Sequence, residues 1–168
     1  MQKYSTGLLI GRFQPFHNGH LWLIKHALKF VDKLVIGIGS ANVQDKNNPL
    51  GCEERKKMAE EVIVHENLSD QISKIVPLDD FHDDEKWFQN TLRQTGPIDA
   101  VIGNNEWVND IFEKQGYPIL RVGYYKRYIL EGEKIRQLIK ENKPWENRIP
   151  NYLLRITNYE LKKKIRNP

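Results

Sequence analysis

The sequence predicts an α/β fold in which a doubly wound, mostly parallel sheet is followed by C-terminal helices. Two observations carry this prediction. Short apolar runs rich in Val, Ile and Leu alternate with segments whose apolar residues recur every three or four positions. A repeat of strand, helix and strand implies right-handed crossovers and a sheet that helices cover on both faces.

The apolar runs are the candidate strands. Each is short, and the first two are followed directly by glycine, which is typical of buried strands that end at a turn. We expect strands at residues 6–10, 34–38, 73–77, 100–103 and 118–122.

The segments between these runs have helical spacing. Leu21, Ile24 and Leu28 form one apolar stripe, and further stripes follow around Met58 and Val62, Phe88 and Leu92, and Val108 and Phe112. After residue 122 the alternation stops, and residues 131–141 and 152–165 read as consecutive helices. The length of 168 residues predicts a single domain over 1–168, with an α/β core of about 1–123 and a C-terminal helical part of about 124–168.

Composition favours a soluble enzyme or binding protein of the cytoplasm. No apolar run is long enough to span a bilayer, and the first residues lack the order of a secretion signal. The one cysteine, Cys52, excludes an intrachain disulfide and favours a reducing compartment. The net charge is +4, with much of the excess at Lys162–Lys164 and Arg166, which we interpret as a solvated helix end. We therefore expect neither a membrane nor a nucleic acid as partner.

The turn after the first predicted strand, GRFQPFHNGH at residues 11–20, concentrates groups that suit a phosphate chain. A helix that starts at about Gly19 would point free N–H groups at an anion. His17 and His20 can both donate to phosphate oxygens, as neutral or charged imidazoles, and Arg12 adds a planar fork of donors. In a doubly wound sheet, ligands bind at this edge, where the strand order reverses.

Other interpretations of this turn are weaker. A histidine at a helix start is often only a cap. Two histidines suggest zinc, but a third ligand is missing, so we predict no metal held by the protein alone. The spacing matches neither GxGxxG nor GxxxxGK[ST], which excludes the usual dinucleotide and P-loop fingerprints.

Two further segments stand out by their composition. Residues 79–85 hold five carboxylates in seven positions; we assign the later ones to a helix start, with Asp83 or Asp84 as cap, and give a function to Asp80 only. Residues 124–128 interleave aromatic and basic side chains, as single-strand nucleic-acid sites do, but we prefer an anion-binding loop or a subunit contact.

The motif GRFQPFHNGH resembles the first motif of the HxGH nucleotidyltransferase superfamily, and its longer form is similar to that of archaeal-type nicotinamide mononucleotide adenylyltransferases. Four more segments are similar in the same order: IGIGSA (36–41), NPLGCEER (48–55), PLDD (77–80) and GNN (103–105). The similarity covers roughly residues 7–140, and several motifs in order are far more specific than one. It implies a Rossmann-like five-stranded sheet of the nucleotidylyl transferase type.

The resemblance also implies a reaction. AMP would pass from ATP, accompanied by Mg²⁺, to nicotinamide mononucleotide (NMN), giving NAD and pyrophosphate, and the enzyme would be a homo-oligomer. His17, His20 and Arg12 would act on the phosphates and reacting groups. The remaining matches divide into an ATP side, with Gly11, Phe13, Gly19, Asn105, Arg127 and Arg136, and an acceptor side, with Ser40, Asp80 and Trp87, whose ring would stack on nicotinamide.

One departure lies in LEGEKIR, residues 130–136. Glu131 and Glu133 stand where the family usually presents Ser or Thr hydroxyls to the triphosphate. A carboxylate there repels phosphate unless a metal ion or Lys134 intervenes. Two alternatives therefore stay open beside NAD synthesis: transfer to another acceptor, such as phosphopantetheine, FMN or a CTP-dependent acceptor, and a catalytically weak nucleotide-binding sensor. The choice between nicotinamide and nicotinic acid mononucleotide is open as well.

Overall fold

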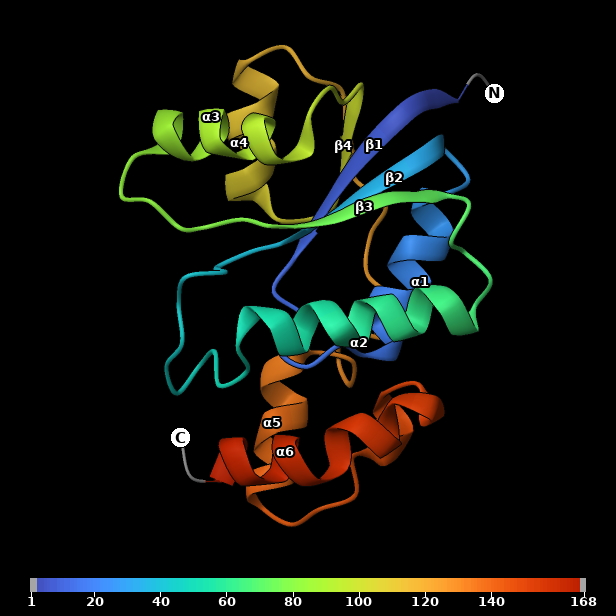
Figure 1. Cartoon of the computed structure of the whole chain (residues 1–168), viewed down its shortest axis with the longest axis vertical. Coiled ribbons are helices and arrows are strands. Elements are labelled where there is room, and N and C mark those ends of the chain that lie inside the picture. The colour runs from blue at the N-terminus through green and yellow to red at the C-terminus, as the bar shows by residue number, and fades with distance from the viewer. Residues whose placement is uncertain (1–2, 167–168) are drawn as a thin grey trace.

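The computed structural model describes residues 3–166 and the side chains in that range other than those of residues 156–160. It confirms the predicted α/β class (Figure 1). The elements are β1 (Tyr4–Gly11), α1 (Asn18–Ala27), β2 (Val31–Ile38), α2 (Cys52–His65), β3 (Ile72–Pro77), α3 (Asp84–Thr95), β4 (Ala100–Ile102), α4 (Glu106–Lys114), β5 (Ile119–Leu120), α5 (Gly132–Lys140), η1 (Glu146–Arg148), η2 (Asn151–Leu153) and α6 (Leu154–Arg166).

All the strand pairs are parallel, and the strand order is β3-β2-β1-β4-β5. From β1 the chain builds outward through β2 and β3, then crosses back to place β4 on the other side of β1. The order therefore reverses between β1 and β4. The carboxyl ends of these two strands flank the crevice in which an open parallel sheet binds its ligands.

The element boundaries differ from the sequence expectations in a few places. β2 begins at Val31 rather than at residue 34, because Val31 and Lys33 already pair with Tyr4 and Thr6 of β1. The edge strand β5 is shorter than expected, because only Ile119 and Leu120 pair with β4. The expected helix at 152–165 is split into η2 and α6.

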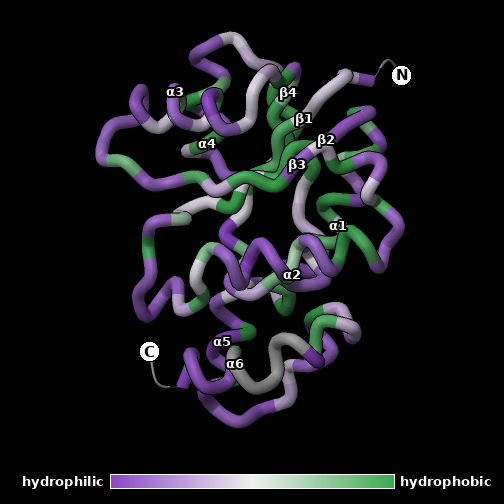
Figure 2. The backbone as a smooth tube through the Cα atoms, in the orientation of Figure 1, coloured by the Kyte–Doolittle hydropathy of each residue, from purple (hydrophilic) through white to green (hydrophobic). Residues whose placement is uncertain are grey.

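The core has two clusters, one on each face of the sheet, because alternate residues of a strand point to opposite faces. Leu9 and Ile36 belong to the cluster under α1 and α2, whereas their neighbours Leu8 and Val35 belong to the cluster under α3 and α4. Figure 2 shows the central strands as the most hydrophobic part of the chain.

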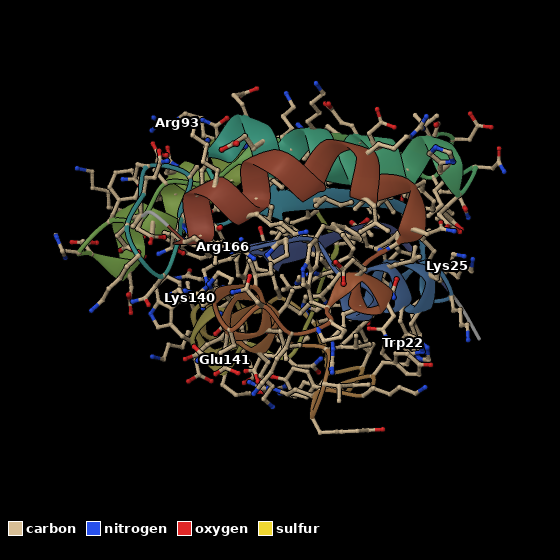
Figure 3. The ribbon with its side chains drawn as sticks, turned by 90° about the horizontal axis from the view of Figure 1, so that it is seen from below. Trp22, Lys25, Arg93, Lys140, Glu141 and Arg166 are labelled. Carbon is tan, nitrogen blue, oxygen red and sulfur yellow. The ribbon has the colours of Figure 1, made fainter. Side chains whose placement is uncertain are left out.

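The C-terminal helices join the first of these clusters. Ile135 and Ile139 of α5 and Leu161 and Ile165 of α6 are buried together with residues of α2. Seen from below, α6 runs alongside α2, and Arg166 lies near the end of α5 (Figure 3). The C-terminal lysines are thus not simply a solvated end, since Lys164 Nζ lies 2.7 Å from Glu54 Oε1 of α2. Among the described residues, no helix is both long and apolar enough to cross a bilayer.

Arg55, in the first turn of α2, ties the loops after β1 and β2 together. Its side chain is 0% exposed. Nη1 donates to the carbonyl oxygens of Arg12 (2.9 Å) and Gly39 (2.7 Å), Nη2 to that of Ser40 (2.9 Å) and Nε to that of Gly51 (3.3 Å). No described carboxylate forms an ion pair with it, and burial lowers the pKa of the guanidinium. Arg55 therefore acts as a buried cross-link between backbone segments that border the ligand crevice.

Candidate active site

A cavity of about 1090 Å³, including its open mouth, lies at the carboxyl ends of β1 and β4. Its walls come from the turn after β1, the first turns of α1, the loop after β4, and the segment that leads into α5. Nine of the twelve site residues expected from the sequence line it: Gly11, Arg12, Phe13, His17, Gly19, His20, Asn105, Arg127 and Arg136.

The two histidines are organised by the backbone at the start of α1. His17 is the N-cap residue, and its Nδ1 accepts the N–H of Gly19 at 3.1 Å. His20 Nδ1 accepts the N–H of His17 at 3.2 Å, and the ring centroids are 3.6 Å apart. Because both Nδ1 atoms accept, each neutral ring carries its proton on Nε2. Two Nε2–H donors are thus left without a partner among the described residues and can bind an anion.

The helix begins one residue earlier than expected, at Asn18 rather than at about Gly19, because His17 caps it. The cap interpretation and the phosphate interpretation are therefore compatible, since they use different ring nitrogens. Gly19 has a role that the sequence did not reveal. A Cβ at this position would lie 2.9 Å from Nδ1 and Cε1 of His17, so glycine makes room for the ring.

Two aromatic side chains support His20 from behind. The ring centroid of Phe13 lies 4.7 Å from that of His20, and the centroid of Phe16 lies 5.4 Å from it. Both phenylalanines are buried. Gly11 is needed for this packing, because a Cβ there would lie 2.8 Å from Cζ of Phe13. Gly11 and Phe13 thus shape the wall of the cavity through contacts with each other and with His20.

Both histidines are neutral at pH 7 in the free protein. Burial lowers the pKa of His17 from 6.5 to about 4, and the charge of Glu131 opposes this only in part. Burial also lowers the pKa of His20, and the neighbouring His17 lowers it further. A bound phosphate would favour the charged imidazolium form of these rings. The rings would therefore gain a proton when the ligand binds and not before.

The stability of the protein is expected to fall as the pH is lowered from 6.5 to about 4. In this window the unfolded chain protonates His17 and the folded protein does not. Because the unfolded state binds more protons, acid favours unfolding, and the contribution of His17 is fully present only above pH 6.5. The free energy of unfolding falls by about 3 kcal/mol over the whole window. Urea denaturation at pH 7 and at pH 4.5 would measure most of this difference.

His17→Asn is the matched control for this pH dependence. Asparagine keeps an N-cap side chain but does not titrate. The variant should therefore lose less stability than the wild type between pH 7 and pH 4.5. An equal loss in both proteins would contradict the assignment to His17.

The arginines of the cavity come from different elements. Arg12 is exposed, and Arg136 of α5 donates from Nη1 to the carbonyl oxygen of Gln14 at 2.6 Å. Burial and then the nearby Arg12 lower the pKa of Arg136, which indicates that two cations share this region. Gly132 permits the approach of α5, because a Cβ there would lie 2.7 Å from the Gln14 carbonyl oxygen.

The two glutamates of LEGEKIR also line the cavity. A carboxylate oxygen of Glu131 lies 3.1 Å from Nζ of Lys134 and another 3.6 Å from Nη2 of Arg127. Lys134 thus pairs with this carboxylate, and this pairing is one of the two conditions under which the sequence allows phosphate nearby. Glu133 makes no ion pair within 4.0 Å to any described side chain.

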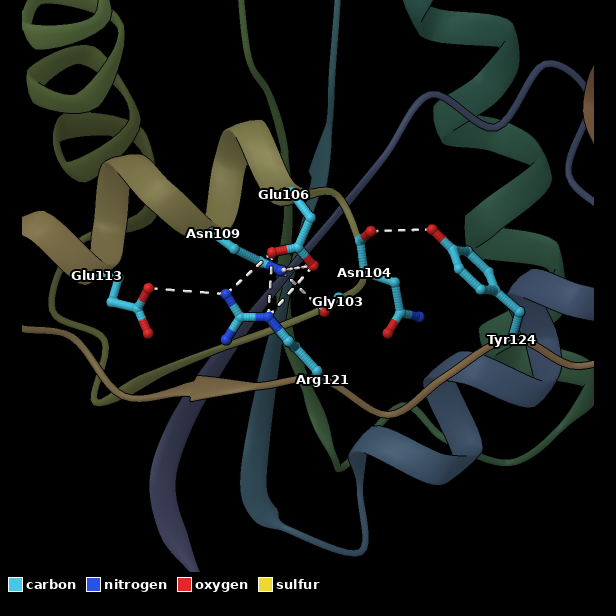
Figure 4. Close-up of polar contacts among 7 residues, drawn as sticks. All are labelled: Gly103, Asn104, Glu106, Asn109, Glu113, Arg121 and Tyr124. Carbon is cyan, nitrogen blue, oxygen red and sulfur yellow. Dashed lines mark hydrogen bonds and ion pairs between the residues drawn. The ribbon is translucent and has the colours of Figure 1, made fainter.

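Asn104 also lines the cavity, although no role was predicted for this residue of the GNN segment. Its Nδ2 donates to the carbonyl oxygen of Gly123 at 2.6 Å, and its Oδ1 accepts the N–H of Gly123 at 2.9 Å. The hydroxyl of Tyr124 donates to the Asn104 carbonyl oxygen (Figure 4). Nearby, Arg121 pairs with Glu106 at 3.0 Å. These contacts fix the segment after β5 against the loop after β4.

The three acceptor-side residues do not line this cavity. The backbone of Asp80 exchanges hydrogen bonds with the side chain of Asn42, and the carbonyl oxygen of Ser40 accepts from Arg55. Trp87 is 2% exposed, whereas Trp107, whose ring centroid lies 4.7 Å away, is 44% exposed. Trp87 therefore presents almost no surface to a ligand, and its stacking role stays a prediction.

The acidic run at 79–85 ends at a helix start, as expected. Asp83 is the N-cap residue of α3, and its Oδ1 accepts the N–H of Lys86 at 2.8 Å. Among the described residues, no group of three or more His, Cys, Asp or Glu side chains could hold a metal ion. Of the later carboxylates, Asp83 caps the helix, and Asp84 accepts the indole N–H of Trp107 at 3.2 Å.

The sequence profile of the cytidylyltransferase-like family matches residues 8–161. The chain belongs to this family. This cytidylyltransferase-like chain is 35% identical over 150 residues to a nicotinamide-nucleotide adenylyltransferase of Methanococcus aeolicus, covering 89% of this chain and 86% of that protein. It is 34% identical over 151 residues to the protein of the same name from Archaeoglobus fulgidus, covering 88% and 87%.

Solved structures show the same fold at lower sequence identity. A bifunctional NMN adenylyltransferase/ADP ribose pyrophosphatase from Francisella tularensis, complexed with AMP and a manganese ion, has a TM-score of 0.73 at 24% identity. The comparison covers 97% of this cytidylyltransferase-like chain and 52% of that protein, so the chain spans about half its length. A putative nicotinate-nucleotide adenylyltransferase from Vibrio parahaemolyticus has a TM-score of 0.65 at 15% identity, with 99% and 98% covered.

Proposed function

We propose that this chain is a nicotinamide mononucleotide adenylyltransferase of NAD biosynthesis, which transfers AMP from ATP to NMN and releases pyrophosphate. One observation carries the proposal: two Nε2–H donors at the start of α1 and three arginines converge on one cavity at the switch point of the sheet. The curated relatives are named nicotinamide-nucleotide adenylyltransferase and are matched over most of their length, which supports NMN as the acceptor.

The reaction needs no nucleophile from the protein. A phosphate oxygen of NMN attacks the α-phosphorus of ATP, the new P–O bond forms, and the bond from that phosphorus to the bridging oxygen breaks, so that pyrophosphate leaves. Positioning and charge stabilisation carry such a transfer. His17 and His20 would donate from Nε2 to the oxygens whose charge grows. Arg12, Arg127 and Arg136 would hold the phosphates, with Asn105 on the same ATP side.

Mg²⁺ would accompany the triphosphate and neutralise part of its charge. Mg²⁺ is commonly held by one or two carboxylates together with substrate phosphates. The donor set of the cavity fits an ion held in this way, since Glu133 lines it and forms no ion pair with a described side chain. The bifunctional Francisella protein was solved in complex with AMP and a manganese ion, which supports the use of a divalent cation.

The proposal is tested by incubating the purified protein with ATP, Mg²⁺ and NMN and following NAD by chromatography. We expect NAD and pyrophosphate in equal amounts. Parallel reactions with nicotinic acid mononucleotide, FMN or phosphopantetheine, and with CTP in place of ATP, define the acceptor and the donor. Faster transfer to one of these acceptors than to NMN would overturn the assignment. ATP binding without transfer to any acceptor would favour a sensor.

We also propose that the protein acts in the cytoplasm and as a homo-oligomer. The single free cysteine, Cys52, supports a reducing compartment. The exposed rings of Tyr124, Tyr125 and Tyr128 support a subunit contact beside the cavity.

A further inference from the structure

Glu131 lies at the mouth of the cavity with its charge already paired. It is the N-cap residue of α5, but its side chain makes no capping hydrogen bond. The carboxylate instead lies between Lys134 and Arg127, at 3.1 Å and 3.6 Å, and its side chain is 33% exposed. These two cations lower the pKa of Glu131, so the carboxylate is ionised at neutral pH.

The position of these partners makes them relevant to phosphate binding. Arg127 and Glu131 both line the cavity that contains His17 and His20. The charge of Glu131 reaches His17, because it opposes the lowering of the His17 pKa by burial. Lys134 Nζ also donates to the carbonyl oxygen of Arg127 at 3.3 Å, which holds the two cations near each other. An anion that enters the cavity therefore meets, at Arg127, a cation that is already paired with a carboxylate.

We propose that Glu131 is an internal competitor for polyphosphate in this cavity. In the free protein its carboxylate takes the place of a phosphate oxygen at Arg127 and Lys134. A triphosphate or pyrophosphate must displace it, because two anions beside the same cations repel each other. Glu131 thus lowers the affinity for pyrophosphate and favours its release after transfer. The inference rests on the proposed function, since it assigns the phosphates to this cavity.

A positioning role and a competing role of the Glu131 side chain predict opposite results. If Glu131 only positioned Arg127 and Lys134, its removal would loosen both cations and weaken anion binding. If it competes with phosphate, its removal frees both cations and strengthens anion binding. Glu131→Gln distinguishes the two, because it keeps the shape of the side chain and removes its charge.

The test is titration calorimetry of the wild type and of Glu131→Gln with inorganic pyrophosphate and Mg²⁺, without any acceptor. We expect the variant to bind pyrophosphate about fivefold more tightly, the scale of one or two partly exposed ion pairs. Glu113→Gln is the matched control, since Glu113 also pairs with an arginine, Arg121 at 3.7 Å, but does not line the cavity. It should bind pyrophosphate like the wild type.

Glu131→Ser provides a second variant that removes the charge with a different side chain, and thermal unfolding checks that each variant is folded. Equal or weaker binding by both folded variants would overturn the inference, as would absence of pyrophosphate binding in every protein. The assay does not involve NMN, so its failure is distinguishable from failure of the proposed function. A wild type that forms NAD while Glu131→Gln shows no gain in pyrophosphate affinity would contradict the competition alone.

Discussion

Replacing His20 with alanine is expected to lower the rate of NAD formation by about 10²–10³-fold, the effect of removing one preorganised donor to a developing charge. The Nε2–H of His20 has no partner among the described residues, whereas its Nδ1 is engaged by the N–H of His17. The substitution therefore removes a donor whose orientation the backbone fixes. The measurement is kcat and the KM for each substrate in the chromatographic assay.

The effect should appear mainly in kcat, because a donor that acts on charge formed in the transition state contributes little to substrate binding. The folded state loses the hydrogen bond from His17 N–H and the packing of Phe13 on the ring, at a cost of about 1–2 kcal/mol. His65→Ala is the control, since His65 is exposed on α2 and does not line the cavity. An unchanged kcat in His20→Ala, or an equal fall in His65→Ala, would refute the role given to His20.

Replacing Arg55 with methionine is expected to lower the free energy of unfolding by about 3 kcal/mol, because hydrogen bonds to a charged group contribute strongly and four are lost. The carbonyl oxygens of Arg12, Gly39 and Ser40 would lose their donor in a partly buried region. Relief of the desolvation of the guanidinium offsets part of the loss. Urea denaturation at pH 7 measures the difference.

Arg93→Met is the matched control for this experiment. Arg93 lies exposed on α3 (Figure 3), and its replacement should change stability by no more than about 0.5 kcal/mol. Arg55→Lys should fall between the wild type and Arg55→Met, because an ammonium group keeps the charge but cannot reach the same carbonyl oxygens as a fork. A loss below about 1 kcal/mol in Arg55→Met would show that the buried cross-link is energetically neutral.

The sequence by itself determined the order and type of the elements and the location of the turn that lines the cavity. Both depend on local properties. Apolar spacing distinguishes strands such as β1 from helices such as α1, and glycines beside histidines and arginine mark the turn proposed to bind phosphate. Nine of the expected site residues meet in one cavity because parallel strands bring successive turns to the same edge of the sheet.

Only the tertiary structure decided the state of these groups. It placed Trp87 in the core and Trp107 at the surface, assigned Nδ1 of both histidines to the backbone, and set Glu131 between Lys134 and Arg127. Burial depends on partners that are distant in sequence, and the tautomers depend on the backbone geometry at the start of α1. The spacing of Arg127 and Lys134 around Glu131 allows the two ion pairs but does not show that they form. For the same reason, the sequence identified Arg55 only as part of a family motif, while the structure revealed it as the link between three backbone segments.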